Sequence, residues 1–169
     1  MAAAAKLLNL NLRFTMQSQL QSNWCWAATS TSTSLFYNPR STWTQCKVVN
    51  AELNQTSCCK KGNSSQCNVP WYLDRALTRT ANFGSMIAGP LSLKALRKEI
   101  EAKRPVGVRI GWKAGGGHFV VIDGISDRGK EETISVRDPI YGSSSYSFTA
   151  FSKSYQGTGQ WTHTYKTQK

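Results

Sequence analysis

The sequence lacks any long hydrophobic run, and it is poor in acidic residues. No stretch approaches the roughly eighteen apolar residues that a transmembrane helix needs, so we expect no membrane-spanning helix. Nine Asp and Glu stand against 21 Lys and Arg, which gives a formal net charge of +12. Because the basic residues are scattered, we interpret them as a solvated surface. That surface would also suit an acidic substrate or an acidic inhibitor.

Nucleic-acid-binding signatures and internal repeats are absent as well. We find no zinc finger, no aromatic–basic ribonucleoprotein motif and no basic heptad region, so nucleic acid is not an expected partner. With 169 residues and no low-complexity linker, the sequence predicts one domain over residues 1–169. Residues 1–6 are too short for a signal peptide, and we interpret them as a processing remnant of a longer chain.

The hydrophobic pattern changes from helical in the first half to alternating in the second. It predicts helices over 24–37, 42–53, 70–80 and 92–103, a loop over 81–90, and strands over 8–14, 106–112, 118–122 and 133–137. Residues 146–151 and 160–165 read as further strands or as a strand and a short helix. The pattern therefore predicts an α+β fold. A helical lobe from about residue 15 to 90 packs on an antiparallel β-sheet lobe from about 91 to 169.

The five cysteines are an odd number, which leaves at least one thiol unpaired. If that thiol is Cys25, the remaining four are candidates for two disulfides: Cys46, Cys58, Cys59 and Cys67. Adjacent cysteines pair poorly, which leaves 46–58 with 59–67, or 46–59 with 58–67. Such bridges would imply an oxidising location outside the cytosol. A zinc site is less favoured because no Cys-x-x-Cys pair occurs, and four reduced thiols are a third alternative.

Cys25 lies in the sequence Gln19-Leu-Gln-Ser-Asn-Trp-Cys-Trp-Ala-Ala28. Asn23 is a suitable N-cap, which would place Cys25 in the first turn of a helix, where free N–H groups and the dipole favour a thiolate. The side-chain amide of Gln19 and the backbone N–H of Cys25 could then form an oxyanion hole. The Thr/Ser run over 29–34 is poor helix material, but packing can override propensity. The alternative for Cys25 is a buried structural cysteine.

His118 is the candidate general base. It follows three glycines and opens an apolar strand, and the glycines allow another segment to approach closely. A satisfied core histidine is the alternative, and we interpret His163 as a packing or surface residue. Asp138 ends the next strand and could orient the imidazole. Asp123, at an odd offset from His118, should point to the opposite face and serve a turn.

Together these motifs resemble the papain-like cysteine peptidases. The order Gln, Cys, Gly-Gly-His and Asp-Pro over about residues 15–142 is most similar to small bacterial secreted and effector peptidases. The resemblance implies Gln19 as oxyanion donor, Cys25 as nucleophile, His118 as base and acid, and Asp138 as the orienting residue. Many papain-like enzymes have Asn in this last role, and Asp matches the bacterial branch.

We therefore predict a cysteine endopeptidase that works through an acyl-thioester, is secreted or delivered into a target cell, and needs no cofactor or metal. It would act as a monomer on protein or peptide substrates, and an acidic inhibitor or immunity protein is a further candidate partner. The expected cleft-lining residues are Trp24, Trp26, Trp112, Gly116 and Gly117, although core packing is an equal alternative for Trp112. A glutamine deamidase or transamidase, or an inert binding or toxin module, are the alternative functions.

Overall fold

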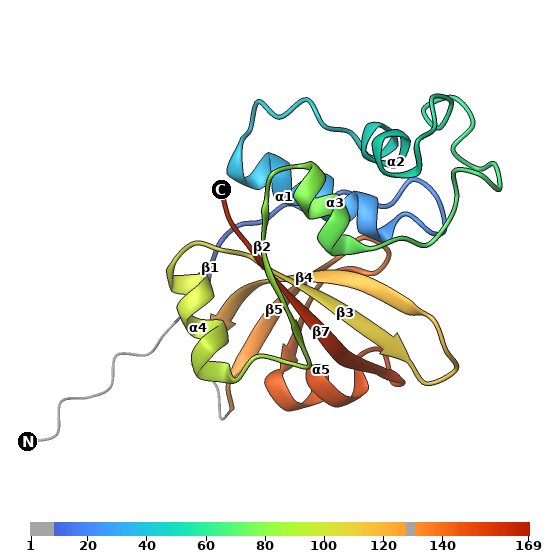
Figure 1. Ribbon diagram of the computed structural model, residues 1–169. Coiled ribbons are helices and arrows are strands. Elements are labelled where there is room, and N and C mark those ends of the chain that lie inside the picture. The colour runs from blue at the N-terminus through green and yellow to red at the C-terminus, as the bar shows by residue number, and fades with distance from the viewer. Residues whose placement is uncertain (1–8, 128–130) are drawn as a thin grey trace, which may run out of the picture.

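The computed structural model describes residues 9–127 and 131–169, and it combines a curved sheet with helices on both sides. Helices α1 (Cys25–Tyr37), α2 (Gln45–Leu53) and α3 (Leu73–Arg79) lie together over one side of the sheet (Figure 1). Helices α4 (Leu93–Glu101) and α5 (Phe148–Ser154) are separate from this group. No helix in the described part of the chain is both long and apolar enough to cross a membrane.

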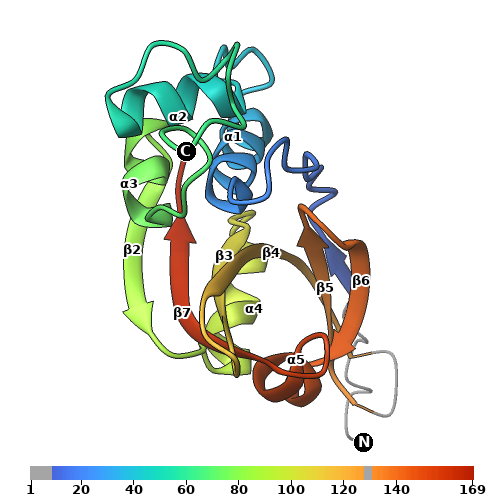
Figure 2. The ribbon, with the colours of Figure 1, turned by 90° about the vertical axis from the view of Figure 1, so that its right-hand side faces the viewer.

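The sheet has seven strands, and every pairing in it is antiparallel. They are β1 (Asn9–Asn11), β2 (Phe83–Ala88), β3 (Val106–Trp112), β4 (Gly117–Ser126), β5 (Thr133–Asp138), β6 (Gly142–Ser147) and β7 (Gly159–Thr167). Their order is β2-β7-β3-β4-β5-β6, with β1 paired to β4. Figure 2 shows β7 between β2 and β3, although it is the last of these strands in the chain. The predicted α+β class, with N-terminal helices packed on an antiparallel sheet, is confirmed.

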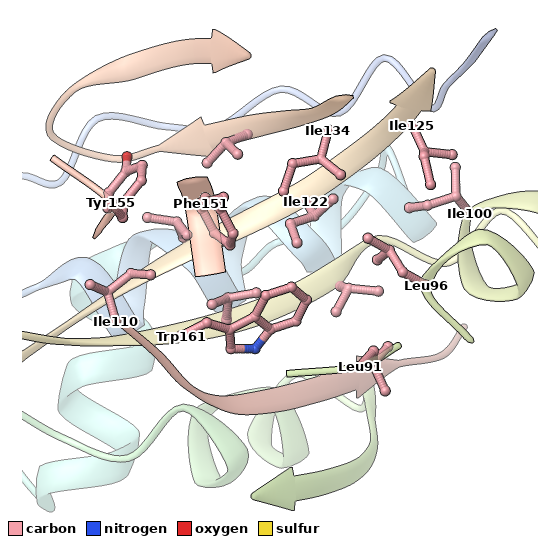
Figure 3. Close-up of a cluster of buried hydrophobic side chains, with 14 residues drawn as sticks. Leu91, Leu96, Ile100, Ile110, Ile122, Ile125, Ile134, Phe151, Tyr155 and Trp161 are labelled. Carbon is pink, nitrogen blue, oxygen red and sulfur yellow. The ribbon is translucent and has the colours of Figure 1, made fainter. Parts of the chain in front are cut away.

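Two hydrophobic cores form because alternate residues of a strand point to opposite faces. The larger core joins the sheet to α4 and α5, and Figure 3 shows Ile110, Ile122, Leu96 and Phe151 gathered around Trp161. The second core joins the opposite face to the first three helices, and it includes Trp24, Trp26, Val48, Leu73, Leu77, Phe119 and Tyr165. The sheet is therefore covered by helices on both faces. The candidate site described below lies between the start of α1 and the sheet.

Helix α1 forms in spite of its Thr/Ser run, whose side chains from 29 to 34 are all buried. Some hydroxyls bond to the helix's own carbonyls, such as Thr33 Oγ1 to Thr29 O at 2.8 Å. Another, Ser32 Oγ, accepts from the backbone N–H of Gln17. Burial against the sheet and α3 thus supports a helix that propensity alone disfavours.

The start of α1 differs from the prediction. Trp24, not Asn23, occupies the N-cap position, and no side chain caps the helix. The amide of Asn23 instead donates to the carbonyl of Asn68, so it ties the start of the helix to a distant loop.

Several sequence-based boundaries were wrong for identifiable reasons. Residues 83–88 form β2, although a loop was predicted there. The prediction missed this strand because an edge strand with almost no buried side chain has no alternating hydrophobic pattern. The predicted turn at Asp123-Gly124 lies inside β4, where the pairing with β5 shifts register. The third helix begins at Leu73, three residues after Pro70. The first strand shrinks to Asn9–Asn11, while Leu8 and the interpreted remnant at 1–6 lie outside the described residues.

The cysteines adopt the second of the two predicted pairings, Cys46–Cys59 with Cys58–Cys67, and Cys25 is free. Bridged sulfurs supply no thiolate, so neither the zinc site nor the four reduced thiols apply. The Cys46–Cys59 bridge joins α2 to the loop over 54–72, and the Cys58–Cys67 bridge closes a ring within that loop. Two residues of the loop, Cys67 and Asn68, hydrogen-bond to the segment just before Cys25.

Candidate active site

His118 and Asp138 meet at one end of the paired strands β4 and β5. His118 Nε2 lies 2.9 Å from Asp138 Oδ1, although the two residues are 20 positions apart in the sequence. Both side chains are almost completely buried. Hairpin pairing therefore places a carboxylate on one nitrogen of the imidazole and leaves Nδ1 for a second partner.

The carboxylate of Asp138 is held by four donors. Oδ1 also accepts the backbone N–H groups of Ile140 at 2.6 Å and Tyr141 at 2.9 Å. Oδ2 accepts the hydroxyl of Tyr155 at 2.6 Å. Burial acts to raise the pKa of Asp138, but hydrogen bonds and the charge of His118 outweigh it and hold the pKa below its ordinary value. The carboxylate is therefore ionised and fixed in position.

Cys25 supplies the second partner of His118. It is the first residue of α1, it is 9% exposed, and its thiol is a hydrogen-bond partner of the imidazole. Burial would lower the pKa of His118, but hydrogen bonds and charge from Asp138 and Cys25 raise it to about 9. The imidazole of His118 is therefore favoured in its protonated form at neutral pH, with the sulfur of Cys25 beside it.

Aromatic rings fix the plane of the imidazole. Trp112 stacks on His118 with centroids 6.2 Å apart, and Tyr141 meets it edge-on at 6.3 Å. The loop between β3 and β4 passes through Gly115 and Gly116 with φ of 97° and 82°, a region that favours glycine. The glycines therefore make the turn that carries His118 to this position.

The loop before Cys25 is braced by the disulfide-closed segment. Trp24 Nε1 donates to Cys67 O at 2.8 Å, and Asn23 N donates to Asn68 Oδ1 at 2.9 Å. Gly62 packs so closely on Trp24 that a Cβ there would lie 2.9 Å from the indole. The start of α1 is thus positioned by residues that the two bridges hold in place.

Gln19 lies in the same loop, but its amide faces the loop itself. Nε2 donates to the carbonyls of Gln21 at 2.9 Å and Ser22 at 2.8 Å, while Oε1 is buried and has no partner in the described part of the chain. Both amide protons are therefore engaged. The backbone N–H of Cys25, at the helix N-terminus, makes no hydrogen bond with any described residue.

A cleft of about 1190 Å³ opens beside Cys25 and His118. Trp112, Gly116, Gly117 and Trp26 are among the residues that line it, and Trp26 has no water-accessible surface. The prediction that Trp24 lines the cleft is wrong. This residue is 1% exposed, it is directed at Cys67, and it does not line the cleft. Its place is the core, because the indole fills the space beneath the loop.

Asp123 and His163, the other acidic residue and the other histidine considered from the sequence, have different contacts. Asp123 is buried and bonds to Arg137 Nε at 2.8 Å and to the backbone N–H of Phe14 at 3.2 Å. It thus joins strands to the N-terminal segment and serves no turn. His163 bonds to Thr162 and lines the cleft from β7. No cluster of three potential metal ligands occurs among residues 9–127 and 131–169.

Sequence reasoning missed two contributors to this geometry. Tyr155, which donates to Asp138, was not singled out because its hydrogen bond joins the end of α5 to the end of β5. Arg109, which lines the cleft, stands in an otherwise apolar strand. An isolated charge within such a strand was the one available signal for it.

Comparison with known proteins identifies a family for most of the chain. The family model for the papain-like cysteine protease AvrRpt2 matches residues 6–156. A comparison with curated proteins finds no match.

Proposed function

Because the chain belongs to the AvrRpt2 family of papain-like cysteine proteases, a family of bacterial effector proteases, we propose that it is an endopeptidase with a Cys25–His118–Asp138 triad. The observation that carries the proposal is the position of His118, whose two ring nitrogens face the thiol and the carboxylate. Hydrolase activity on protein substrates follows from the family, and the roles of individual residues are our inference.

The reaction begins with attack of the Cys25 thiolate on a peptide carbonyl carbon. The backbone N–H of Cys25 stabilises the resulting oxyanion. Gln19 would be the second donor if its amide releases the carbonyl of Gln21 or Ser22 when substrate binds. The imidazolium of His118 then protonates the leaving amine, and a thioester remains on Cys25.

Water completes the cycle. Neutral His118 removes a proton from water, the hydroxide attacks the thioester carbonyl, and the thiolate leaves with its electron pair. Asp138 keeps Nδ1 of His118 directed at the sulfur and stabilises the positive ring. Since Asp138 is itself held by two backbone N–H groups and Tyr155, this orientation is built into the fold.

Location and partners follow from the same proposal. The protease would be secreted and then delivered into a target cell, in keeping with its effector family and its two disulfides. An acidic inhibitor or immunity protein would complement the net charge of +12. No step of the proposed reaction requires a cofactor.

The decisive experiment is digestion of a denatured protein mixture by the wild type and by Cys25→Ala, followed by mass spectrometry of peptide termini. We expect new termini with the wild type alone. Equal results for the two proteins would contradict the proposal, and a one-dalton shift without new termini would indicate deamidation instead. A thiol-reactive probe at neutral pH should label Cys25 in the folded wild type. Absence of labelling would favour an inert module.

A further inference from the structure

The guanidinium of Arg109 lies in the cleft, and no carboxylate of the described residues forms an ion pair with it. Arg109, on β3, pairs in register with Phe119 on β4 and His163 on β7, and all three line the cleft. Residues paired across strands share a face of the sheet, so Arg109 occupies the middle of the row that faces α1 and the cleft. This position is one strand away from the segment that carries His118.

Two glycines make room for the guanidinium. A Cβ at Gly117 would lie 2.7 to 2.9 Å from Nη2, Cζ and Nε of Arg109, and one at Gly111 would lie 3.3 Å from Nη1. The planar group therefore rests against the bare backbone of the residue immediately before His118. A side chain at position 117 would displace it, so the glycine fixes where this charge lies.

The charge is not neutralised within the described part of the chain. Arg79, Arg97, Arg104 and Arg137 each pair with a carboxylate, whereas the guanidinium of Arg109 makes one hydrogen bond to the described residues, from Nη1 to Thr162 Oγ1 at 3.0 Å. A guanidinium has five N–H donors in a planar fork, and most of these remain available here. A carboxylate is the group that matches this fork, with two parallel hydrogen bonds.

The neighbouring charges leave this part of the cleft positive. Asp74 and Arg75 line it from α3, and Arg75 lies over the rings of Trp71 and Tyr72. The pKa of Tyr165 is raised to about 12, chiefly by burial and by the charge of Asp74, against the opposing charge of Arg109. The phenol is therefore neutral near pH 7 and does not cancel the guanidinium. Among the described residues that line the cleft, Asp74 is the one carboxylate, against Arg75 and Arg109.

We infer that Arg109 is a specificity-determining residue that binds an acidic side chain, Asp or Glu, of the peptide held in the cleft. The inference rests on the proposed endopeptidase function. It identifies the substrate class as peptides with a carboxylate close to the bond that is cut, and it assigns Arg109 no part in the chemical step.

The test uses pairs of peptides that are identical except at one position, where one peptide has Glu and the other has Gln. A separate pair is made for each position around the cleavage site. Hydrolysis by the wild type is measured as kcat/KM. Binding of the same pairs to Cys25→Ala is measured by fluorescence anisotropy, so that a failure of hydrolysis does not obscure recognition. At one position we expect Glu to be favoured about tenfold in both measurements.

Arg109→Gln should reduce that preference to about one, and Arg109→Glu should reverse it in favour of Gln. Arg40→Gln, which makes the same charge change at an exposed position outside the cleft lining, should retain the preference. Thermal unfolding of each variant checks that the fold is intact. Binding to Cys25→Ala without a Glu preference at any position would overturn the inference, whether or not the wild type cuts peptides. Loss of hydrolysis with the binding preference retained would count against the endopeptidase proposal alone.

Discussion

The hydroxyl of Tyr155 donates a hydrogen bond of 2.6 Å to Oδ2 of Asp138, and both side chains are buried beneath His118. The other carboxylate oxygen already accepts from His118 and two backbone N–H groups. Tyr155 is therefore the donor that prevents Oδ2 from being left unsatisfied in the interior. It links the end of α5 to the proposed triad.

Tyr155→Phe should weaken the proposed reaction without unfolding the protein. The ring keeps its packing on Phe151, but Asp138 loses a charge-assisted hydrogen bond worth about 1.5–3 kcal/mol. The pKa of Asp138 should rise and that of His118 should fall, so the alkaline limb of kcat/KM should move to lower pH. We expect a roughly tenfold decrease in kcat/KM, equivalent to about 1.4 kcal/mol. Tyr146→Phe is the control, because Tyr146 contacts the ring of Tyr155 at 5.2 Å. An unchanged pH profile for Tyr155→Phe would contradict a positioning role.

The raised pKa of His118 predicts how stability depends on pH. Its value of about 9 in the folded protein exceeds the ordinary 6.5, so folding favours the protonated ring. The resulting stabilisation is complete below about pH 6.5 and is lost as the pH rises through about 9. Urea unfolding from pH 6 to 10 should show this decrease. In Cys25→Ala the loss should begin at lower pH, because one of the groups that raise the pKa of His118 is removed. A stability that rises between pH 7 and 9 would oppose the assignment.

The two disulfides should differ in their effect on activity. The carbonyl oxygen of Cys67 accepts the indole N–H of Trp24, whereas the Cys46–Cys59 bridge joins α2 to the start of the loop. Replacing Cys58 and Cys67 together by Ser should therefore lower kcat/KM more than replacing Cys46 and Cys59, at a temperature where both variants are folded. Circular dichroism establishes the folded fraction. Equal losses in the two double variants would show that bracing of the Cys25 loop is not specific to one bridge.

Asp123→Asn and Asp138→Asn should separate stability from catalysis. Asp123 is buried against Arg137, so neutralising it should cost about 3–5 kcal/mol of folding free energy and leave the proposed triad in place. Asp138→Asn removes the charge that stabilises the imidazolium and should lower kcat/KM by roughly two orders of magnitude. Activity is expressed per folded molecule, counted by labelling of Cys25 with a thiol probe. A larger catalytic loss in Asp123→Asn would favour Asp123 as the orienting residue.

A Gly62→Ala substitution tests the packing beneath the Cys25 loop. The added Cβ would lie 2.9 Å from the indole of Trp24 and 3.1 Å from the carbonyl oxygen of Cys58, so backbone or indole must move. Overpacking of this kind costs about 1–3 kcal/mol, and we expect a lower melting temperature together with reduced activity. Gly157→Ala, where φ is 88° but no atom lies within 4 Å of the added Cβ, controls for backbone strain without a clash. Equal activity in the two variants would argue against coupling between this packing and the site.

The sequence allowed the convergence of three side chains to be predicted better than the boundaries of elements. Cys25, His118 and Asp138 could be found because each stands at a strong local signal: a helix start, a glycine turn and the end of a strand. The strand β2 could not be predicted, because its side chains are mostly exposed and do not alternate between buried and exposed positions. Neither could Tyr155, whose role depends on a contact between α5 and β5 that no local pattern specifies.

Strand β7 is the last to be synthesised, yet it lies between β2 and β3 (Figure 2). The ribosome therefore releases all the other strands before β7, and until β7 pairs, the facing edges of β2 and β3 have no partner strand. Pairings between such distant segments form slowly, since the cost of loop closure precedes any gain. Residues 159–167 therefore complete the sheet, and they bring His163 and Tyr165 to the cleft.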